Sequence, residues 1–237
     1  MDATLTNLGL ATLAFVGGHF VLSSAPVRGP AAGTRGEPMF RGFYSLLMIA
    51  ALVWMIDAYR FAAHVKVWDA GVVAEPVMYV FMFFAAIFFV CSVTTRNPTL
   101  AGMDMMPGSA ATSRGIYAVT RHPMLAAIAL WAAGHLLVRG TAAGLLFFGG
   151  MFVLAAGGMA HIDARRRAKA AAGNDPDWAS FEAGTSRAPF RAILEGRARL
   201  SLGDIGWLRI LGGIVLFAAM LYGHGPVVGL YLVPIGM

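Results

Sequence analysis

Long apolar runs are the feature of this sequence that most restricts its fold. About 20 consecutive apolar residues span a bilayer as an α-helix, because a helix satisfies its backbone hydrogen bonds internally. Such runs, separated by Gly, Pro and charged residues, lie near residues 5–24, 43–63, 76–94, 123–139, 141–161 and 207–223. The pattern predicts an all-α fold, a polytopic transmembrane helix bundle of about six spans.

The composition supports this class. The chain is 58% hydrophobic and 13% charged, whereas soluble domains average about 25% charged residues. The net charge of +6 fits basic loops beside a membrane, and we expect membrane lipid rather than nucleic acid as a partner. The first run, 5–24, has no basic stretch before it, so we expect a retained span and not a signal peptide. The single cysteine, Cys91, excludes an intramolecular disulfide.

We expect a single domain over residues 1–237, with one long basic loop over 162–206. The start of this loop, Asp163–Lys169, is expected to extend the fifth helix past the membrane. The last apolar run, Pro226–Met237, is too short to span. It is therefore predicted to lie at the interface or to re-enter the membrane.

The middle of the basic loop carries a helix-start pattern. Asn174–Glu182 reads as a turn followed by a short helix, with Asp175 or Asp177 near its first residue. Trp178 and Phe181 are expected to anchor this helix at the membrane interface. The loop itself is either a basic flank against anionic lipid or a binding lobe for an anionic ligand.

The basic residues predict the orientation. With six spans, loops 25–42, 95–122 and 162–206 share one side of the membrane. Of the 18 Lys and Arg residues, all but three lie in these loops or, for Arg209, directly beside them. The exceptions are Arg60, Lys66 and Arg139. The positive-inside rule makes this side cytoplasmic. For a bacterial protein the prediction is a multi-pass inner-membrane protein with both termini periplasmic.

Two histidines fall inside apolar spans and follow small residues. His19 follows Gly17-Gly18, and His135 follows Ala132–Gly134. Small residues let a bulky partner approach a helix backbone closely. The partner is either another helix or a flat macrocycle whose metal the imidazoles bind, and two imidazoles suit haem b.

Other ionisable residues mark further candidate positions. Asp57, Arg60 and His64 share a helical face at the end of the second span. Either Asp57 and Arg60 pair with each other, or Arg60 neutralises a cofactor carboxylate and Asp57 orients a ligand imidazole. Arg121-His122 precedes Pro123 at a helix N-terminus. His122 there is either a polar cap or a contact to an anionic group of a cofactor.

These residues together resemble the NnrU family along nearly the whole chain. The resemblance rests on His19, Thr120-Arg-His-Pro123, Ala133-Gly-His135, Thr185-Ser-Arg-Ala-Pro-Phe190, Ala192-Ile-Leu-Glu-Gly-Arg197 and Tyr222-Gly-His-Gly-Pro226. NnrU proteins are associated with denitrification and nitric-oxide metabolism. The resemblance therefore implies a link to that metabolism, with denitrification enzymes as partners.

A relative of the family, 15-cis-zeta-carotene isomerase, is a membrane enzyme that uses haem b. The resemblance implies haem b here, with His19 and His135 as axial ligands and a hydrophobic small molecule as substrate. The plant isomerases have a cysteine three residues before the second histidine, implicated in ligand switching, where this chain has Ala132. The resemblance therefore implies haem binding more directly than it implies isomerase-like redox chemistry.

Helix geometry leaves the choice of ligand pair open. His122 and His135 are separated by about 20 Å of helical rise, too far to serve one iron. The depths of His19 and His135 in their spans differ by roughly 10 Å on straight helices. If tilt does not remove this mismatch, His19 with His122 becomes the alternative pair.

A second, shorter resemblance is to membrane S-adenosylmethionine-dependent methyltransferases of the isoprenylcysteine type. It implies a cofactor site lined by Arg121, His122, Asp163 and Arg166. The paired glutamates expected in those enzymes are absent, since Ala164 follows Asp163. A third hypothesis is a non-catalytic accessory factor for denitrification enzymes.

Overall fold

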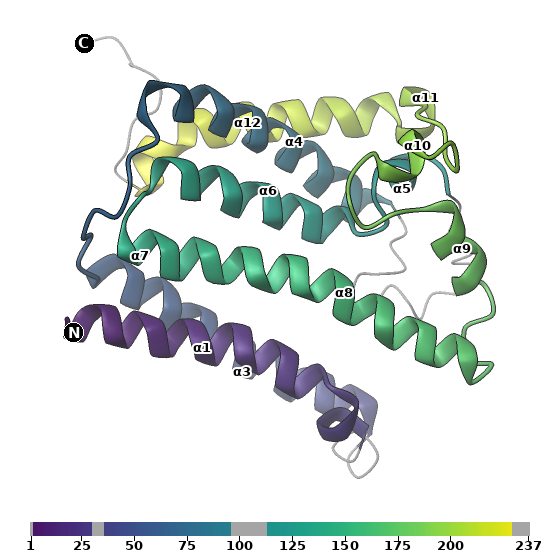
Figure 1. The fold of residues 1–237 in the computed structure, drawn as a ribbon, viewed down its shortest axis with the longest axis horizontal. Helices are drawn as coiled ribbons and strands as arrows, with labels where there is room; N and C mark the ends of the chain where they lie inside the picture. Colours follow the sequence, from purple (N-terminus) through teal and green to yellow (C-terminus); the bar gives the residue numbers. More distant parts are fainter. Residues whose placement is uncertain (1, 30–35, 96–112, 229–237) are drawn as a thin grey trace. The chain divides into compact units, whose positions relative to one another are not determined.

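The computed structural model describes residues 2–29, 36–95 and 113–228, and these residues form helices and connecting turns (Figure 1). The longer helices are α1 (Ala3–Ser23), α3 (Glu37–Phe61), α4 (Ala74–Thr94), α6 (Pro123–Val138), α8 (Gly150–Ala171) and α12 (Trp207–Val228). The short elements are η1 (Gly71–Val73), α5 (Ile116–Val119), α7 (Ala142–Gly144), η3 (Leu145–Gly149), α9 (Trp178–Gly184), α10 (Arg191–Leu194) and α11 (Leu202–Ile205). The predicted all-α fold is confirmed.

Five helical stretches are long and apolar enough to cross a membrane, and they coincide with five of the predicted spans. The sixth predicted span is α6, a shorter apolar helix of 16 residues. Its length of about 24 Å is slightly less than a typical hydrocarbon core of about 30 Å. Among the starts of these stretches, the largest shift is at α3, which begins at Glu37 rather than near residue 43.

The chain divides into two compact units. Unit 1 comprises Met1–Met78 and Ala132–Gly158, and unit 2 comprises Tyr79–Trp131 and Met159–Met237. The prediction of a single domain over 1–237 stays a prediction beside this division.

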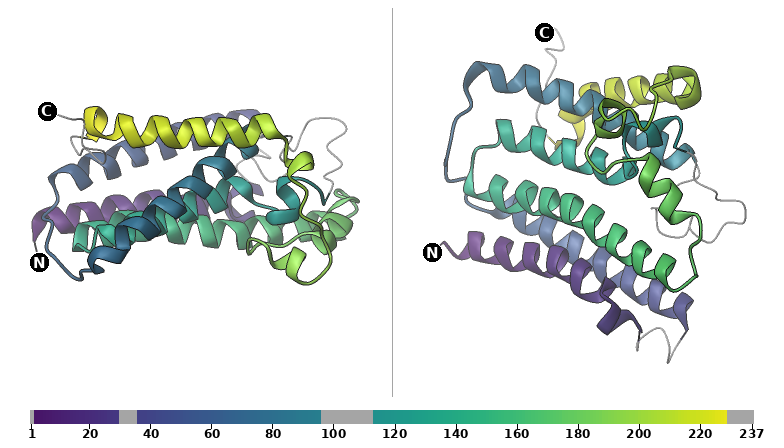
Figure 2. Two further views of the ribbon diagram at one scale, coloured as in Figure 1. Left: turned by 90° about the horizontal axis from the view of Figure 1, so that it is seen from above. Right: turned by 45° about the vertical axis from the view of Figure 1, so that its right-hand side comes forward.

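In unit 1, α1 and α3 form an antiparallel pair (Figures 1 and 2). The backbone N–H of Ala63 donates to Thr4 Oγ1 at 3.0 Å, which joins the start of α1 to the end of α3. The helix of α7, η3 and α8 runs parallel to α1, because Thr12 packs on Gly150 and the Phe20 ring packs on Gly157. These two glycines allow the close approach of the helices.

The break between the predicted spans 123–139 and 141–161 forms the turn between α6 and α7. The Gly140 carbonyl accepts hydrogen bonds from the N–H groups of Val67 at 2.7 Å and Trp68 at 3.0 Å. A Cβ atom at Gly140 would overlap the carbonyl oxygen of Trp68, so only glycine fits this approach. The turn therefore lies beside the segment that follows α3.

In unit 2, α12 packs on α4, where Gly213 lies against the backbone of Ile87 and the Phe83 and Phe217 rings meet edge to face at 5.7 Å. The extension of α8 beyond Asp163 is confirmed, since α8 reaches Ala171. A short helix in the basic loop is also confirmed: α9 begins at Trp178, directly after Asp177.

The prediction that Trp178 and Phe181 anchor α9 at the membrane interface is wrong. Both side chains are 2% exposed and belong to a hydrophobic core that includes Tyr117. The Phe181 and Tyr117 rings meet edge to face at 5.6 Å. Since α9 folds back onto α5, its aromatic side chains are removed from water inside unit 2 instead of inside the bilayer.

The C-terminal run is partly described. Pro226–Val228 continue α12, so this part is regular helix. The predicted interfacial or re-entrant course of the remainder lies outside the described residues.

Candidate functional site

The Thr120–Pro123 element forms a sharp turn between α5 and α6 in unit 2. Pro123 is the first residue of α6, a position where proline loses no helical hydrogen bond. The Thr120 hydroxyl donates to the Arg187 carbonyl at 2.9 Å, and the Arg121 N–H donates to the Ser186 carbonyl at 2.9 Å. The second motif, Thr185–Phe190, therefore lies directly against the first.

A buried carboxylate joins these two motifs to α8. The Asp163 side chain, 1% exposed, accepts a hydrogen bond from His122 Nε2 at Oδ1 over 2.7 Å. Its Oδ2 lies 3.2 Å from Arg121 Nε and 3.3 Å from Arg187 Nε. We call Arg121, His122, Asp163 and Arg187 the Asp163 cluster. Two guanidinium groups and one imidazole thus surround a single carboxylate.

Glu182 of α9 closes the cluster on its outer side. Its backbone carbonyl accepts from Arg121 Nη1 at 3.0 Å, and its carboxylate is bound by Arg167, with a closest distance of 2.6 Å. Arg121 is 6% exposed, whereas the Arg167 and Arg187 side chains are about half exposed. Positive and negative groups therefore alternate from the interior to the surface, which compensates the charges that burial would otherwise leave unpaired.

Burial lowers the pKa of His122, an effect stronger than the opposing attraction of Asp163. The ring is therefore neutral at neutral pH, with its Nε2–H donating to Asp163. Its Nδ1 then carries a lone pair, and no described residue donates a hydrogen bond to it. This buried nitrogen is the atom of the cluster that is free to accept a proton.

Arg166 does not join the cluster. Its guanidinium lies 3.1 Å from Asp175 Oδ2 and stacks over the Trp178 ring at 5.1 Å. Of the four residues implied by the methyltransferase resemblance, the structure brings Arg121, His122 and Asp163 together, while Arg166 fixes the turn before α9.

The two membrane histidines implied as haem ligands both lie in unit 1. His19 on α1 has Nδ1 2.8 Å from the Phe15 carbonyl, and its ring lies at the edges of Phe15 and Tyr44. His135, near the end of α6, stacks on Phe148 with ring centroids 4.7 Å apart. Each imidazole therefore has a fixed aromatic environment of its own.

The continuous helix from Ala142 to Ala171 measures the offset between these histidines. His135 lies at the level of Phe148, and Phe20, next to His19, lies at the level of Gly157. The rise from Phe148 to Gly157 is about 13 Å. The His19 ring leans back toward Phe15, which leaves an offset on the order of 10 Å. The binding of one haem by both rings stays a prediction, and this offset is the geometry that such binding has to accommodate.

Asp57 and Arg60 also belong to unit 1, and both are exposed on α3. Within the described chain no ion pair joins Asp57 to Arg60. His64 follows the end of α3 and meets the Tyr59 ring edge to face at 5.4 Å. The role of Asp57 and Arg60 as cofactor contacts stays a prediction. The predicted contacts of Arg121 and His122 to a cofactor also stay predictions. The partners that the structure describes for these two side chains are protein groups.

The described residues hold no group of three or more His, Cys, Asp or Glu side chains able to bind a metal ion. This finding concerns sites made by several side chains. Haem is held by one or two axial ligands, so the haem prediction is a separate matter.

The fold and the cluster define a polytopic helical membrane protein with a buried arginine–histidine–aspartate cluster beside its basic loop. The NnrU protein family model matches residues 7–232, and the chain belongs to the NnrU family. The family expected from the motifs is thereby confirmed. None of the curated proteins and none of the solved structures compared with the chain matches it.

Arg187 and Glu182 are members of the site that residue-type reasoning did not select. Arg187 lies inside the Thr185–Phe190 motif that supports the family resemblance, and this motif was the available signal. Glu182 lies in a short helix with no distinguishing spacing. Its selection depends on α9 folding back over Arg121.

Replacing Asp163 tests the central role of its carboxylate. Asp163→Ala leaves Arg121 buried without its ion pair, and we expect a loss of about 3–5 kcal/mol in the free energy of unfolding. Thermal unfolding in detergent measures this loss. Glu195→Ala is the control, because Glu195 pairs with Arg191 in an exposed position and should change little. Equal melting temperatures of the two variants would contradict the central role of Asp163.

Proposed function

We propose that this NnrU-family protein is an inner-membrane haem b protein linked to nitric-oxide metabolism, with His19 as the axial ligand. The observation that carries the proposal is the hydrogen bond from His19 to the Phe15 carbonyl at 2.8 Å. A carbonyl accepts only, so Nδ1 must carry the proton and Nε2 keeps its lone pair. A fixed tautomer of this kind is typical of metal-binding histidines.

His19 fits this role better than the pair of His19 and His135. The offset of about 10 Å between the two rings argues against both binding one iron. Met48 also packs against Gly18, so one side of α1 beside His19 is filled by protein. A haem with one protein ligand keeps a position open for a small molecule such as nitric oxide. An isomerase-like reaction on a hydrophobic small molecule would use the same open position.

The absorption spectrum of the purified protein tests this ligation. We expect non-covalent haem with a high-spin spectrum, because one imidazole leaves the sixth position without a strong protein ligand. His19→Ala should lower haem retention at least tenfold, whereas His135→Ala should leave it nearly unchanged. His64→Ala is the control for loss of an exposed imidazole. A low-spin spectrum that depends equally on His19 and His135 would restore the pair and overturn the single-ligand proposal.

A second candidate, a membrane S-adenosylmethionine-dependent methyltransferase, is favoured by one observation. Arg121, His122 and Asp163 meet in a single buried cluster, as that resemblance implies. Asp163 already pairs with two arginines, so its carboxylate is a weak partner for a cationic cofactor. The neutral His122, with Nδ1 open to a proton, is the group that suits such a reaction as a base.

Calorimetry with S-adenosylmethionine separates this candidate from the first. If the methyltransferase function holds, wild-type protein binds the cofactor and His122→Gln binds it at least tenfold more weakly. The conservative change keeps a neutral polar side chain, and circular dichroism checks its fold. The absence of binding to folded wild-type protein eliminates the candidate.

We also propose that both termini lie in the periplasm and that the basic loop 162–206 is cytoplasmic. The support is the concentration of arginine in that loop, together with the pairing of Thr4 and Ala63 at one end of unit 1. A role beside denitrification enzymes, as partner or accessory factor, is part of the same proposal.

Reporter fusions test the orientation. Alkaline phosphatase fused after Gly225 should be active, because that enzyme matures only outside the cytoplasm. The same reporter fused after Gly173, in the basic loop, should be inactive. The reverse pattern of activity would invert the proposed orientation.

A further inference from the structure

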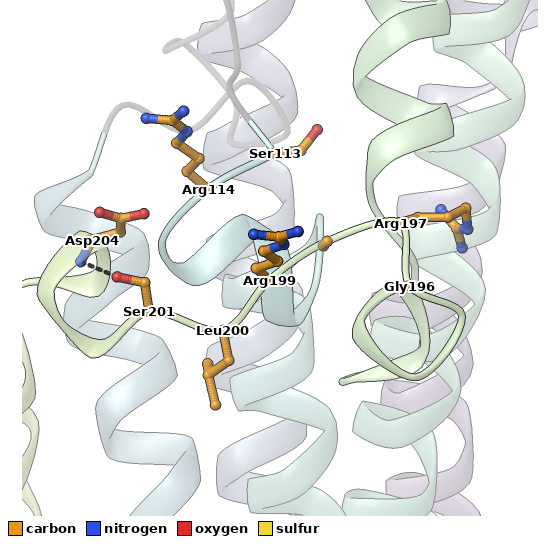
Figure 3. A pocket seen from close by; sticks show the side chains of 9 residues that line it. Ser113, Arg114, Gly196, Arg197, Arg199, Leu200, Ser201 and Asp204 are labelled. Carbon is orange, nitrogen blue, oxygen red and sulfur yellow. Dashed lines mark hydrogen bonds between the residues drawn. The ribbon is translucent and has the colours of Figure 1, made fainter.

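A cavity of about 660 Å³ lies in unit 2, and its lining includes none of the four residues of the Asp163 cluster (Figure 3). Its walls are the segment that enters α5 and the segment between α10 and α11. Its polar lining includes Ser113, Arg114, Arg197, Arg199, Ser201 and Asp204. The end of the Ala192–Arg197 motif contributes Gly196 and Arg197 to the lining, but the sequence analysis did not predict a cavity there.

The two walls are held together at Gly115. This residue has φ of 60°, a conformation that favours glycine, and its backbone approaches the Asp204 carbonyl so closely that no side chain would fit. Ser201 caps α11 by accepting a hydrogen bond from the Asp204 N–H at 3.1 Å. Its own hydroxyl hydrogen remains available to a ligand. The lining is therefore built by backbone contacts and not by mobile side chains alone.

The charges of the lining do not balance. Arg197 is held by the Glu195 carboxylate and by the Thr185 carbonyl at 2.8 Å. Arg114 and Arg199 are exposed, and neither forms an ion pair in the part of the chain that the structure describes. In Figure 3 their side chains come from opposite walls, and Asp204 is the one carboxylate among the described residues of the lining. Two guanidinium groups against one carboxylate leave a net positive cavity.

The chain beside the cavity is apolar and exposed. Leu200 lines the cavity and is 49% exposed, and Trp207 and Leu208 just beyond it are 64% and 84% exposed. Trp207 is the first residue of α12, a helix able to cross a membrane. Tryptophan at the end of a span is typical of the bilayer interface, where lipid headgroups lie. The lining residues Ser201 and Asp204 thus precede by only a few residues the point where α12 would enter the membrane.

We propose that this cavity binds a phosphate group, carried by an anionic lipid headgroup or by a soluble phosphate ester. Arginine guanidinium groups bind phosphate oxygens through paired hydrogen bonds, and the serine hydroxyl adds a donor. The volume exceeds what a bare phosphate needs and accommodates a glycerol phosphate group. This site is independent of the proposed haem and of the Asp163 cluster.

Native mass spectrometry of the full-length protein in detergent, titrated with phosphatidylglycerol, measures the binding. The test variant is Arg114→Gln with Arg199→Gln. The control is Lys169→Gln with Arg191→Gln, which removes the same charge from the basic loop outside the cavity. At roughly 1 kcal/mol per arginine near a lipid surface, the test variant should bind about 30-fold more weakly. The control should bind as the wild type does.

Three comparisons decide the outcome. Weaker binding in the test variant alone supports the cavity, and equal weakening in both variants overturns it in favour of general surface charge. Phosphatidylcholine bound as tightly as phosphatidylglycerol also overturns it. Glycerol 3-phosphate separates the two sources: binding as tight as that of the lipid assigns the site to a soluble ester, and much weaker binding assigns it to a headgroup. If folded wild-type protein binds neither phosphatidylglycerol nor glycerol 3-phosphate, the proposal is rejected.

Discussion

The buried carboxylate of Asp163 is the interaction on which the organisation of the basic loop depends. An ionised carboxylate that is 1% exposed must be compensated, and it is compensated by Arg121, Arg187 and His122. These partners come from the turn before α6 and from the segment after α9. The single group on α8 therefore fixes two loop segments that are more than 60 residues apart in the chain, as the bond between Thr120 and Arg187 shows. Around this point α9 closes, and the core of Tyr117, Trp178 and Phe181 becomes possible.

The same physical constraint separates two kinds of candidate site. In the Asp163 cluster each charged side chain has a described partner of opposite charge, which is what a stabilising centre requires. The cavity beside Arg114 and Arg199 is open, and its charges are unbalanced, which is what a site for an external anion requires. His19 is a third case, a neutral ring whose tautomer is set by its own helix.

The structure also bears on whether one histidine or two would bind the proposed haem. The family resemblance implied His19 and His135 together, and the depth of each in its span already gave an offset of roughly 10 Å. In the structure His135 stacks on Phe148, and Phe20, next to His19, packs on Gly157. The rise between Phe148 and Gly157 gives an offset of the same order. We therefore propose a single axial ligand. This single-ligand form leaves one coordination position open, which the proposed role in nitric-oxide metabolism would use.

The sequence by itself determined the helical class, the positions of the helices within several residues, the turn at Gly140 and the family, because apolar length, helix breakers and motif order are local properties. It also selected Arg121 and His122. The shorter resemblance also placed Asp163 with them. The tertiary structure alone decided that Arg187 and Glu182 join this cluster, and that Trp178 and Phe181 are buried in unit 2 rather than at the membrane interface. The reason is that leaving water is favourable in free energy for an aromatic side chain both in a protein core and at the membrane interface. Only the path of the chain after α8, set by pairing of the buried Asp163 with distant arginines, determines which surrounding it meets.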